Sequence, residues 1–396
     1  MGHPAWVDGR DGFCNLGFKG SCDVFAQRID ANGKYLWSAA GVPVAQVSNV
    51  NSASNGLAMT SDQAGGAILA WETNNGGCCT IYSQRIDANG SPVWPLNGVQ
   101  ISSTPTIVIG PIRVPPQIVT DGTGGAIVSW WNIQYVPLTH DPTISAQRIS
   151  PQGQFMWPSA GVTVVPLLWQ NDQQYSMTSD EKGGAIFAGA NPNITVMPNI
   201  WTVTVQRVTP DGQMAWGAGV GVTDEHIPDI SPSVTADGVG GTFITWQGCD
   251  FQGPPCHIRT HHVGANGIPA WAARVEVAAV PTASNGAQLV VDGKGGVVTL
   301  WTDCRTGSLN TCPDQLSLYG QRIDATGKIV WQGQGFAIAS GTGNRGVIYP
   351  GFASGFTVLN DGESGAILAW PDGRRHPCSV DPSIGECDLF AQHIKF

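Results

Sequence analysis

Short apolar runs, separated by polar turns that contain glycine, recur along the whole chain. In the clearest copy, residues 121–130 (DGTGGAIVSW), a polar turn leads into an apolar run that ends in tryptophan. Close copies end at Trp71, Gly189, Trp246, Trp301 and Trp370. Runs of this length, with no apolar period of about 3.6 residues, predict strands and no helices.

The aspartates of these copies are nearly evenly spaced. They are Asp62, Asp121, Asp180, Asp237, Asp292 and Asp361, at intervals of 59, 59, 57, 55 and 69 residues. Self-similarity at such a period indicates a repeat architecture. We therefore expect one repeat-built domain over residues 1–396, with units that start near Trp6, Trp71, Trp130, Gly189, Trp246, Trp301 and Trp370.

Each unit predicts four antiparallel strands, named A to D in chain order. In the unit at 116–165, strand A is 117–121, B is 126–130, C is 144–150, and D starts at 154–157 and leads into GVTVV. The DxxGG turn after A and the glycine turn after C tolerate positive φ, which favours hairpins. Strand C occurs seven times, at 26–30 (AQRID), 83–87, 146–150, 205–209, 260–264, 320–324 and 391–395.

Twelve of the fifteen tryptophans keep fixed positions in the units. Strand B carries Trp6, Trp71, Trp130, Trp246, Trp301 and Trp370, and strand D carries Trp37, Trp94, Trp157, Trp216, Trp271 and Trp331. Large side chains repeated in this way are expected to wedge between neighbouring sheets. We interpret them as scaffold and not as a sugar-binding ladder.

Four-stranded antiparallel units repeated in this way predict an all-β fold, a β-propeller. The chain starts at the end of a strand B and ends with a strand C. We expect seven blades, the first without strand A and the last without strand D. Six blades are the alternative, with one surplus strand that would pair with the edge of another molecule and support self-assembly.

The combination DGxGGAIxAWxDxR, a variable loop, and then DxxAQRIDxxGxxxW resembles the propeller-type repeats of large secreted or surface proteins of bacteria. The resemblance covers essentially the whole chain. It implies secretion and a propeller, and it transfers no catalytic residue. The copies do not show the SxDxGxTW pattern of sialidase-like Asp boxes.

Charge narrows the set of partners. Charged residues make up 12% of the chain and the net charge is -10. Phosphate binding needs clustered Lys and Arg, so a nucleic-acid partner is disfavoured. No run approaches the roughly 18 apolar residues of a membrane span. The first residues lack the charged and apolar regions of a signal peptide, so we expect none in the chain as given. We expect a mature or excised form, because the chain begins inside a repeat.

Eight of the ten cysteines form close pairs in the loop between strands B and C: Cys14/Cys22, Cys249/Cys256, Cys304/Cys312 and Cys378/Cys387. Pairs that bracket a short loop predict local disulfides and an extracellular or cell-surface location. Zinc is the competing interpretation, but the spacing lacks the paired CxxC pattern. Cys78 and Cys79 are adjacent, and the sequence leaves open whether they bond to each other or stay reduced.

A WxDxR motif is present in three units, as Asp8 and Arg10, Asp303 and Arg305, and Asp372 and Arg374. In one interpretation these side chains bind sugar hydroxyls or carboxylates. In the other interpretation, each Asp and Arg form a local pair that stabilises the long loop between strands B and C. The cysteines of the same units would stabilise that loop as well. The second interpretation is favoured, because surface pairs of this kind are common.

Three tryptophans are out of register, namely Trp131, Trp169 and Trp201. One interpretation is an aromatic platform for a sugar or a partner protein. The other is that they fill space, as Trp201 would where Gly189 replaces the tryptophan of strand B.

Metal and catalytic signals are weak. His257, His261 and His262 cluster, but without a nearby carboxylate they predict polar surface residues and no metal site. Residues 8–12 (DGRDG) resemble a calcium loop but lack its full pattern, so we expect no cofactor beyond, at most, a structural calcium ion. No GxSxG, HExxH or phosphate-loop motif occurs.

The sequence therefore favours a non-enzymatic extracellular protein that binds glycans or proteins or forms part of a surface assembly. A secreted polysaccharide hydrolase or lyase, with acids gathered in the propeller funnel, is the alternative.

Overall fold

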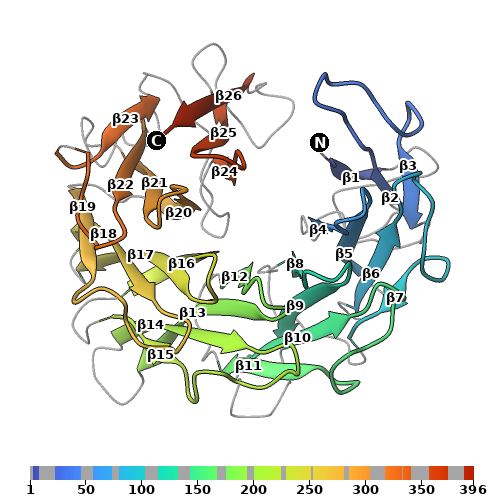
Figure 1. Cartoon of the computed structure of the whole chain (residues 1–396), viewed down its shortest axis with the longest axis horizontal. Coiled ribbons are helices and arrows are strands. Elements are labelled where there is room, and N and C mark those ends of the chain that lie inside the picture. The colour runs from blue at the N-terminus through green and yellow to red at the C-terminus, as the bar shows by residue number, and fades with distance from the viewer. Residues whose placement is uncertain are drawn as a thin grey trace. The chain divides into compact units, whose positions relative to one another are not determined.

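The computed structural model describes residues 3–8, 23–45, 57–73, 80–102, 115–132, 143–166, 175–193, 200–223, 229–250, 253–280, 285–303, 317–331, 333–339, 356–372 and 388–396. These residues form strands β1 to β26 in seven antiparallel sheets (Figure 1). Within these ranges, no helix is long and apolar enough to cross a membrane. The all-β prediction is confirmed.

The strands of each sheet follow the predicted order. Strand A is β4 (Leu57–Ser61), β8 (Gln117–Thr120), β12 (Ser176–Ser179), β16 (Asp229–Ala236), β20 (Asn285–Val291) and β24 (Thr357–Asn360). Strand B is β1 (Ala5–Asp8), β5 (Ala67–Thr73), β9 (Ala126–Asn132), β13 (Ala185–Asn193), β17 (Thr242–Asp250), β21 (Val297–Asp303) and β25 (Gly365–Asp372).

Strand C is β2 (Asp23–Ala26), β6 (Thr80–Ile86), β10 (Thr143–Ile149), β14 (Ile200–Val208), β18 (Gly253–Val263), β22 (Ser317–Ile323) and β26 (Asp388–Lys395). Strand D is β3 (Val42–Ala45), β7 (Val99–Gln100), β11 (Val162–Pro166), β15 (Val220–Gly221), β19 (Val275–Val280) and β23 (Phe336–Ala339).

Five sheets contain all four strands in the order A-B-C-D, and two contain three. The first sheet is β1-β2-β3 and so lacks strand A, whereas the seventh is β24-β25-β26 and lacks strand D among the described residues. Consecutive four-stranded meanders of this kind are the blades of a β-propeller. The predicted blade type and the two incomplete end sheets are confirmed.

The DxxGG turn requires its two glycines for different reasons. Gly124 has a φ of 88°, which a residue with a side chain rarely adopts. Gly125 has no such requirement, but a Cβ there would lie 2.2 Å from the carbonyl oxygen of Ile149 on strand C. The first glycine therefore makes the turn, and the second allows strand C to approach it.

One prediction about strand D was wrong. The repeat tryptophans assigned to it lie before it, in the connection from strand C, as Trp157 does before β11. The main-chain N–H of Trp157 donates to the side chain of Gln147 instead of to a neighbouring strand. A side-chain hydrogen bond therefore holds the segment before strand D in place. The pattern of apolar residues, which we used to predict the strands, does not reveal such a bond.

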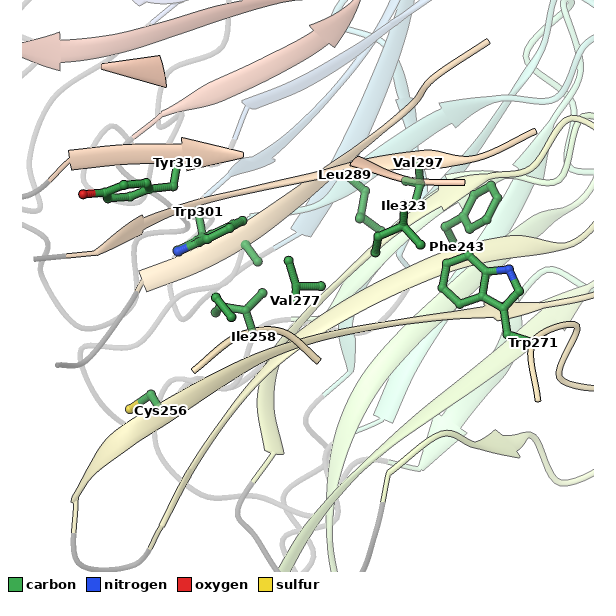
Figure 2. Close-up of a cluster of buried hydrophobic side chains, with 12 residues drawn as sticks. Phe243, Cys256, Ile258, Trp271, Val277, Leu289, Val297, Trp301, Tyr319 and Ile323 are labelled. Carbon is green, nitrogen blue, oxygen red and sulfur yellow. The ribbon is translucent and has the colours of Figure 1, made fainter. Parts of the chain in front are cut away.

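The core lies between successive sheets. Trp71 of β5 packs against Val24 and Ala26 of the first sheet, while Ile68 packs toward the third sheet with Trp130. Successive residues of a strand point to opposite faces, so one strand B supplies two cores. Figure 2 shows the cluster between the fifth and sixth sheets, with Phe243 beside Trp271 and Trp301 near Tyr319.

The chain divides into two compact units, and the division falls within the fourth sheet. One unit is 1–169, 181–185 and 207–214; the other is 170–180, 186–206 and 215–396. In the first, β4 contacts β8; in the second, β16 contacts both β12 and β20, and β20 contacts β24. The A strands thus adjoin one another within each unit.

Candidate functional site

The repeated aspartates stabilise the fold through hydrogen bonds. Asp121 is buried, and its Oδ1 accepts hydrogen bonds from the backbone N–H groups of Thr123 (2.8 Å) and Gly125 (2.9 Å). Its Oδ2 accepts from Nε of Arg148 on strand C at 3.0 Å. The same arrangement joins Asp62 to Arg85 and Asp292 to Arg322. These carboxylates therefore hold the DxxGG turn and link it to strand C.

The repeated arginine and tryptophan converge on one acceptor in the next sheet. Nη1 of Arg85 lies 3.2 Å and Nε1 of Trp94 lies 2.9 Å from the carbonyl oxygen of Pro151. Arg148 and Trp157 share the carbonyl of Pro210 in the same way. Each pair therefore ties one sheet to the turn of the following sheet, a scaffold role that the sequence predicted for the tryptophans alone.

A glutamine that the sequence analysis did not single out completes the network. Oε1 of Gln84 accepts the main-chain N–H of Trp94 at 3.0 Å, and Nε2 donates to the carbonyl oxygen of Pro95 at 2.9 Å. The constant ten-residue separation of glutamine and tryptophan was the available signal. It recurs at Gln27/Trp37, Gln147/Trp157, Gln206/Trp216 and Gln321/Trp331.

Because the shared residues hold the sheets together, residues that differ between units are the candidates for function. Among the WxDxR residues, the structure describes the side chain of Asp303. It is fully buried, and its Oδ2 accepts the indole N–H of Trp301 at 2.8 Å. This contact pins the end of β21 and supports the structural interpretation. Arg10, Arg305 and Arg374 lie outside the described residues, as do the side chains of Asp8 and Asp372.

Of the three out-of-register tryptophans, the described side chain is Trp131. It lies near the end of β9, opposite Ile144 of β10, and is partly exposed. Its indole N–H is buried and has no acceptor in the described part of the chain. Trp169 and the side chain of Trp201 lie outside the described residues. Trp131 is thus a partly exposed aromatic side chain one residue before the end of strand B.

The histidine cluster requires a correction. We expected polar surface residues without a nearby carboxylate, but His261 is buried, Nδ1 of His257 lies 2.9 Å from Oε2 of Glu276, and Nε2 of His262 lies 2.9 Å from Oδ2 of Asp237. In the repeat, His261 stands in the place of glutamine and His262 in the place of arginine. Across the described residues no group of three or more His, Cys, Asp or Glu is arranged to hold a metal ion.

Protonation in this cluster follows from burial and contact. Burial, and then the neighbouring His262, lower the pKa of His261. Burial raises the pKa of Asp237, but hydrogen bonds from His262, Val239 and Gly241 outweigh it, so the net pKa is lowered. The fifth sheet therefore carries His261 where the other six sheets carry glutamine, and His262 where five of them carry arginine and the seventh carries His393.

Replacing His261 by glutamine should reduce the pH dependence of stability. The pKa of His261 is lower in the folded chain than the unfolded value of about 6.5, so protonation favours unfolding. Its contribution is complete above the unfolded pKa and is lost as the pH falls through it. Glutamine does not titrate, and its oxygen can accept the main-chain N–H of Trp271, a gain of about 1 kcal/mol.

The measurement is urea unfolding of both proteins at about pH 7.5 and about pH 5.5. His3, whose pKa is also lowered by burial, stays in both proteins and leaves some pH dependence. An equal loss of stability between the two pH values in wild type and His261→Gln would contradict the assignment.

The structure describes one of the predicted disulfide cysteines in full. Cys256 is disulfide-bonded and buried near the start of β18. The register of β17 and β18 places Cys249 directly opposite Cys256, as the predicted pairing requires.

The other three predicted cysteine pairs stay predictions, because all six residues lie outside the described part of the chain: Cys14 with Cys22, Cys304 with Cys312, and Cys378 with Cys387. The adjacent Cys78 and Cys79 lie outside it as well, so their state stays open. The expectation of stapled loops between strands B and C therefore has structural support in the fifth sheet, through Cys256.

No family model and no curated protein matches the chain. Among solved structures, the polysaccharide lyase Uly1 is 10% identical over 99% of this chain and 87% of its own, with a TM-score of 0.51. A protein of unknown function from Dyadobacter fermentans is 10% identical over 86% and 94%, with a TM-score of 0.46. An endo-arabinase from Bacteroides thetaiotaomicron is 9% identical over 89% and 97%, with a TM-score of 0.38. The likeness to the lyase concerns the fold alone.

Proposed function

We propose that this chain is a non-enzymatic extracellular protein that recognises a glycan or another protein, or serves as a subunit of a surface assembly. The observation that carries the proposal is that the repeated polar residues form hydrogen bonds that stabilise the fold. Examples are the contacts of Asp121 with Arg148 and of Gln84 with Trp94. Recognition is then left to residues that vary between units. Variable loops on a rigid scaffold are the usual place for binding residues.

Trp131 is the binding residue that the described structure favours. A partly exposed indole offers apolar surface to a ligand. A sugar ring or a partner side chain would cover this surface. The proposal requires no cofactor.

The extracellular location rests on cysteine chemistry. Disulfides persist in oxidising compartments, and Cys256 is bonded. The resemblance of the repeat to secreted and surface proteins of bacteria points the same way.

The alternative is a secreted polysaccharide hydrolase or lyase, and its motive is the shared fold with the lyase Uly1. Such chemistry needs an acid and a base within reach of the substrate. Asp62, Asp121 and Asp292 are buried and bonded to turn N–H groups and arginines, so these three are poorly suited to either role.

The test has two parts on the purified chain. Glycan and protein arrays should yield a ligand, and a panel of polysaccharides should remain uncleaved when product size and new reducing ends are followed. Trp131→Ala should weaken the binding about tenfold or more, whereas the control Tyr35→Ala, which removes an aromatic ring that is 56% exposed, should leave it unchanged.

Cleavage of a polysaccharide would establish the alternative. Arrays without any ligand, or equal losses of binding in the Trp131→Ala and Tyr35→Ala variants, would contradict the proposal.

A further inference from the structure

The connection from β18 to β19 differs from its counterparts in the side chain that faces it. In the third sheet, Gln147 accepts the main-chain N–H of Trp157 at 3.1 Å and donates to the carbonyl oxygen of Pro158 at 2.8 Å. The fifth sheet has His261 at the position of this glutamine. The connection after β18, residues 264–274, thus lacks the amide side chain that bonds its counterpart in the third sheet.

His261 is a buried group that titrates. Its side chain is 6% exposed, and its Nδ1 is buried without a hydrogen-bond partner among the described residues. The imidazole lies 6.2 Å from the ring of Trp271, the tryptophan of the connection. A neutral imidazole is tolerated in such surroundings, but a charged one needs either a counterion or water.

The two carboxylates near His261 already have partners. Oδ2 of Asp237, in the turn between β16 and β17, lies 2.9 Å from Nε2 of His262. Oε2 of Glu276, on β19, lies 2.9 Å from Nδ1 of His257. A proton on His262 is therefore matched by a carboxylate, whereas a proton on His261 is not.

The other neighbours of His261 do not balance a charge either. Arg259 and Val263 share its face of β18, and Val263 packs in a core with apolar residues of the fourth sheet. Ile244 of β17 lies directly opposite His261. Arg274, before β19, is a further cation. Protonated His261 thus meets apolar groups and like charges, and water is the remaining source of stabilisation.

We propose that residues 264–274 form an acid-sensitive switch, in which protonation of His261 opens the connection and releases Trp271 from the sixth sheet. Two contacts join Trp271 to that sheet in the closed form. Its Nε1 donates to the carbonyl oxygen of Ala325 at 3.1 Å, and its ring lies so close to Gly327 that an added Cβ would be 3.0 Å from it. Opening gives water access to His261 and breaks both contacts.

The direction of the switch follows from the pKa of His261. Burial, and then His262, lower this pKa, so the open form, with a value of about 6.5, takes up the proton more readily. The connection is therefore fully held above about pH 6.5 and is released as the pH falls below that value. Between about pH 7.5 and about pH 5.5, the open population should rise by up to about tenfold.

Hydrogen–deuterium exchange of the full chain tests the proposal, with each segment's exchange rate compared with the free-peptide rate at the same pH. From about pH 7.5 to about pH 5.5, the protection of residues 264–271 should fall by up to about tenfold. Residues 150–157 form the matching segment of the third sheet and should keep their protection, because Gln147 holds them. Neither segment contains a titrating side chain.

Two variants assign the effect to a residue. His261→Gln introduces the side chain that the other six sheets carry, and it should abolish the loss of protection at low pH. The control His257→Gln removes a titrating histidine of the same strand, one that is paired with Glu276, and the loss of protection should persist. Neither variant alters Trp131, so the result is separate from the test of ligand binding.

Three outcomes would overturn the proposal: unchanged protection of residues 264–271 at low pH, an equal loss in residues 150–157, or the same loss in His261→Gln as in wild type. The second outcome would identify a general acid destabilisation of the chain instead of a local opening. Loss of the effect in His257→Gln would also overturn the assignment to His261.

Discussion

Replacing Asp121 by alanine is expected to lower the free energy of unfolding by about 3–5 kcal/mol. The substitution removes the acceptor for the N–H groups of Thr123 and Gly125 and leaves Arg148, which is mostly buried, without its carboxylate. Arg148 also donates to the carbonyl oxygen of Pro210, so the link from the third sheet to the next turn weakens with it.

Two control variants separate the contributions of the charge and of the turn hydrogen bonds to this loss of stability. Asp121→Asn keeps an oxygen for the turn and removes the charge, so it should cost less than alanine. Asp87→Ala removes a turn aspartate that accepts from the N–H groups of Asn89 and Ser91, in exposed hydrogen bonds, and should cost about 1 kcal/mol. Chemical unfolding followed by circular dichroism measures all three variants. Equal losses for Asp121→Ala and Asp87→Ala would show that the ion pair adds nothing.

Trp301→Ala is expected to cost about 3–5 kcal/mol, because the side chain is fully buried between the fifth and sixth sheets (Figure 2) and leaves a large cavity. A finer comparison uses phenylalanine. Trp301→Phe removes the N–H that Asp303 accepts, whereas Trp71→Phe removes an N–H without an acceptor among the described residues.

Trp301→Phe should therefore destabilise the chain by about 1–3 kcal/mol more than Trp71→Phe does. Unfolding in urea, monitored by circular dichroism, gives both values. Losses that agree within error would indicate that Asp303 does not serve to anchor Trp301, and would reopen the interpretation of the WxDxR motif as a ligand-binding element.

The candidate site was predictable only in part. Trp131 stood out in the sequence because it breaks the register of the other tryptophans, and the structure places it at the end of β9. The pairing of His257 with Glu276 was not visible, because Glu276 follows 19 residues later, on the next strand of the sheet.

The sequence by itself determined the order of the strands, the places of the turns and the two incomplete end sheets. These features depend on local chemistry, such as the glycines of DxxGG and the short apolar runs, which acts between residues close together in the chain. Only the tertiary structure decided which partner each polar group takes. Arg148 and Trp157 meet at the carbonyl oxygen of Pro210 because the sheets stack, and spacing along the chain does not specify which atoms such stacking brings together.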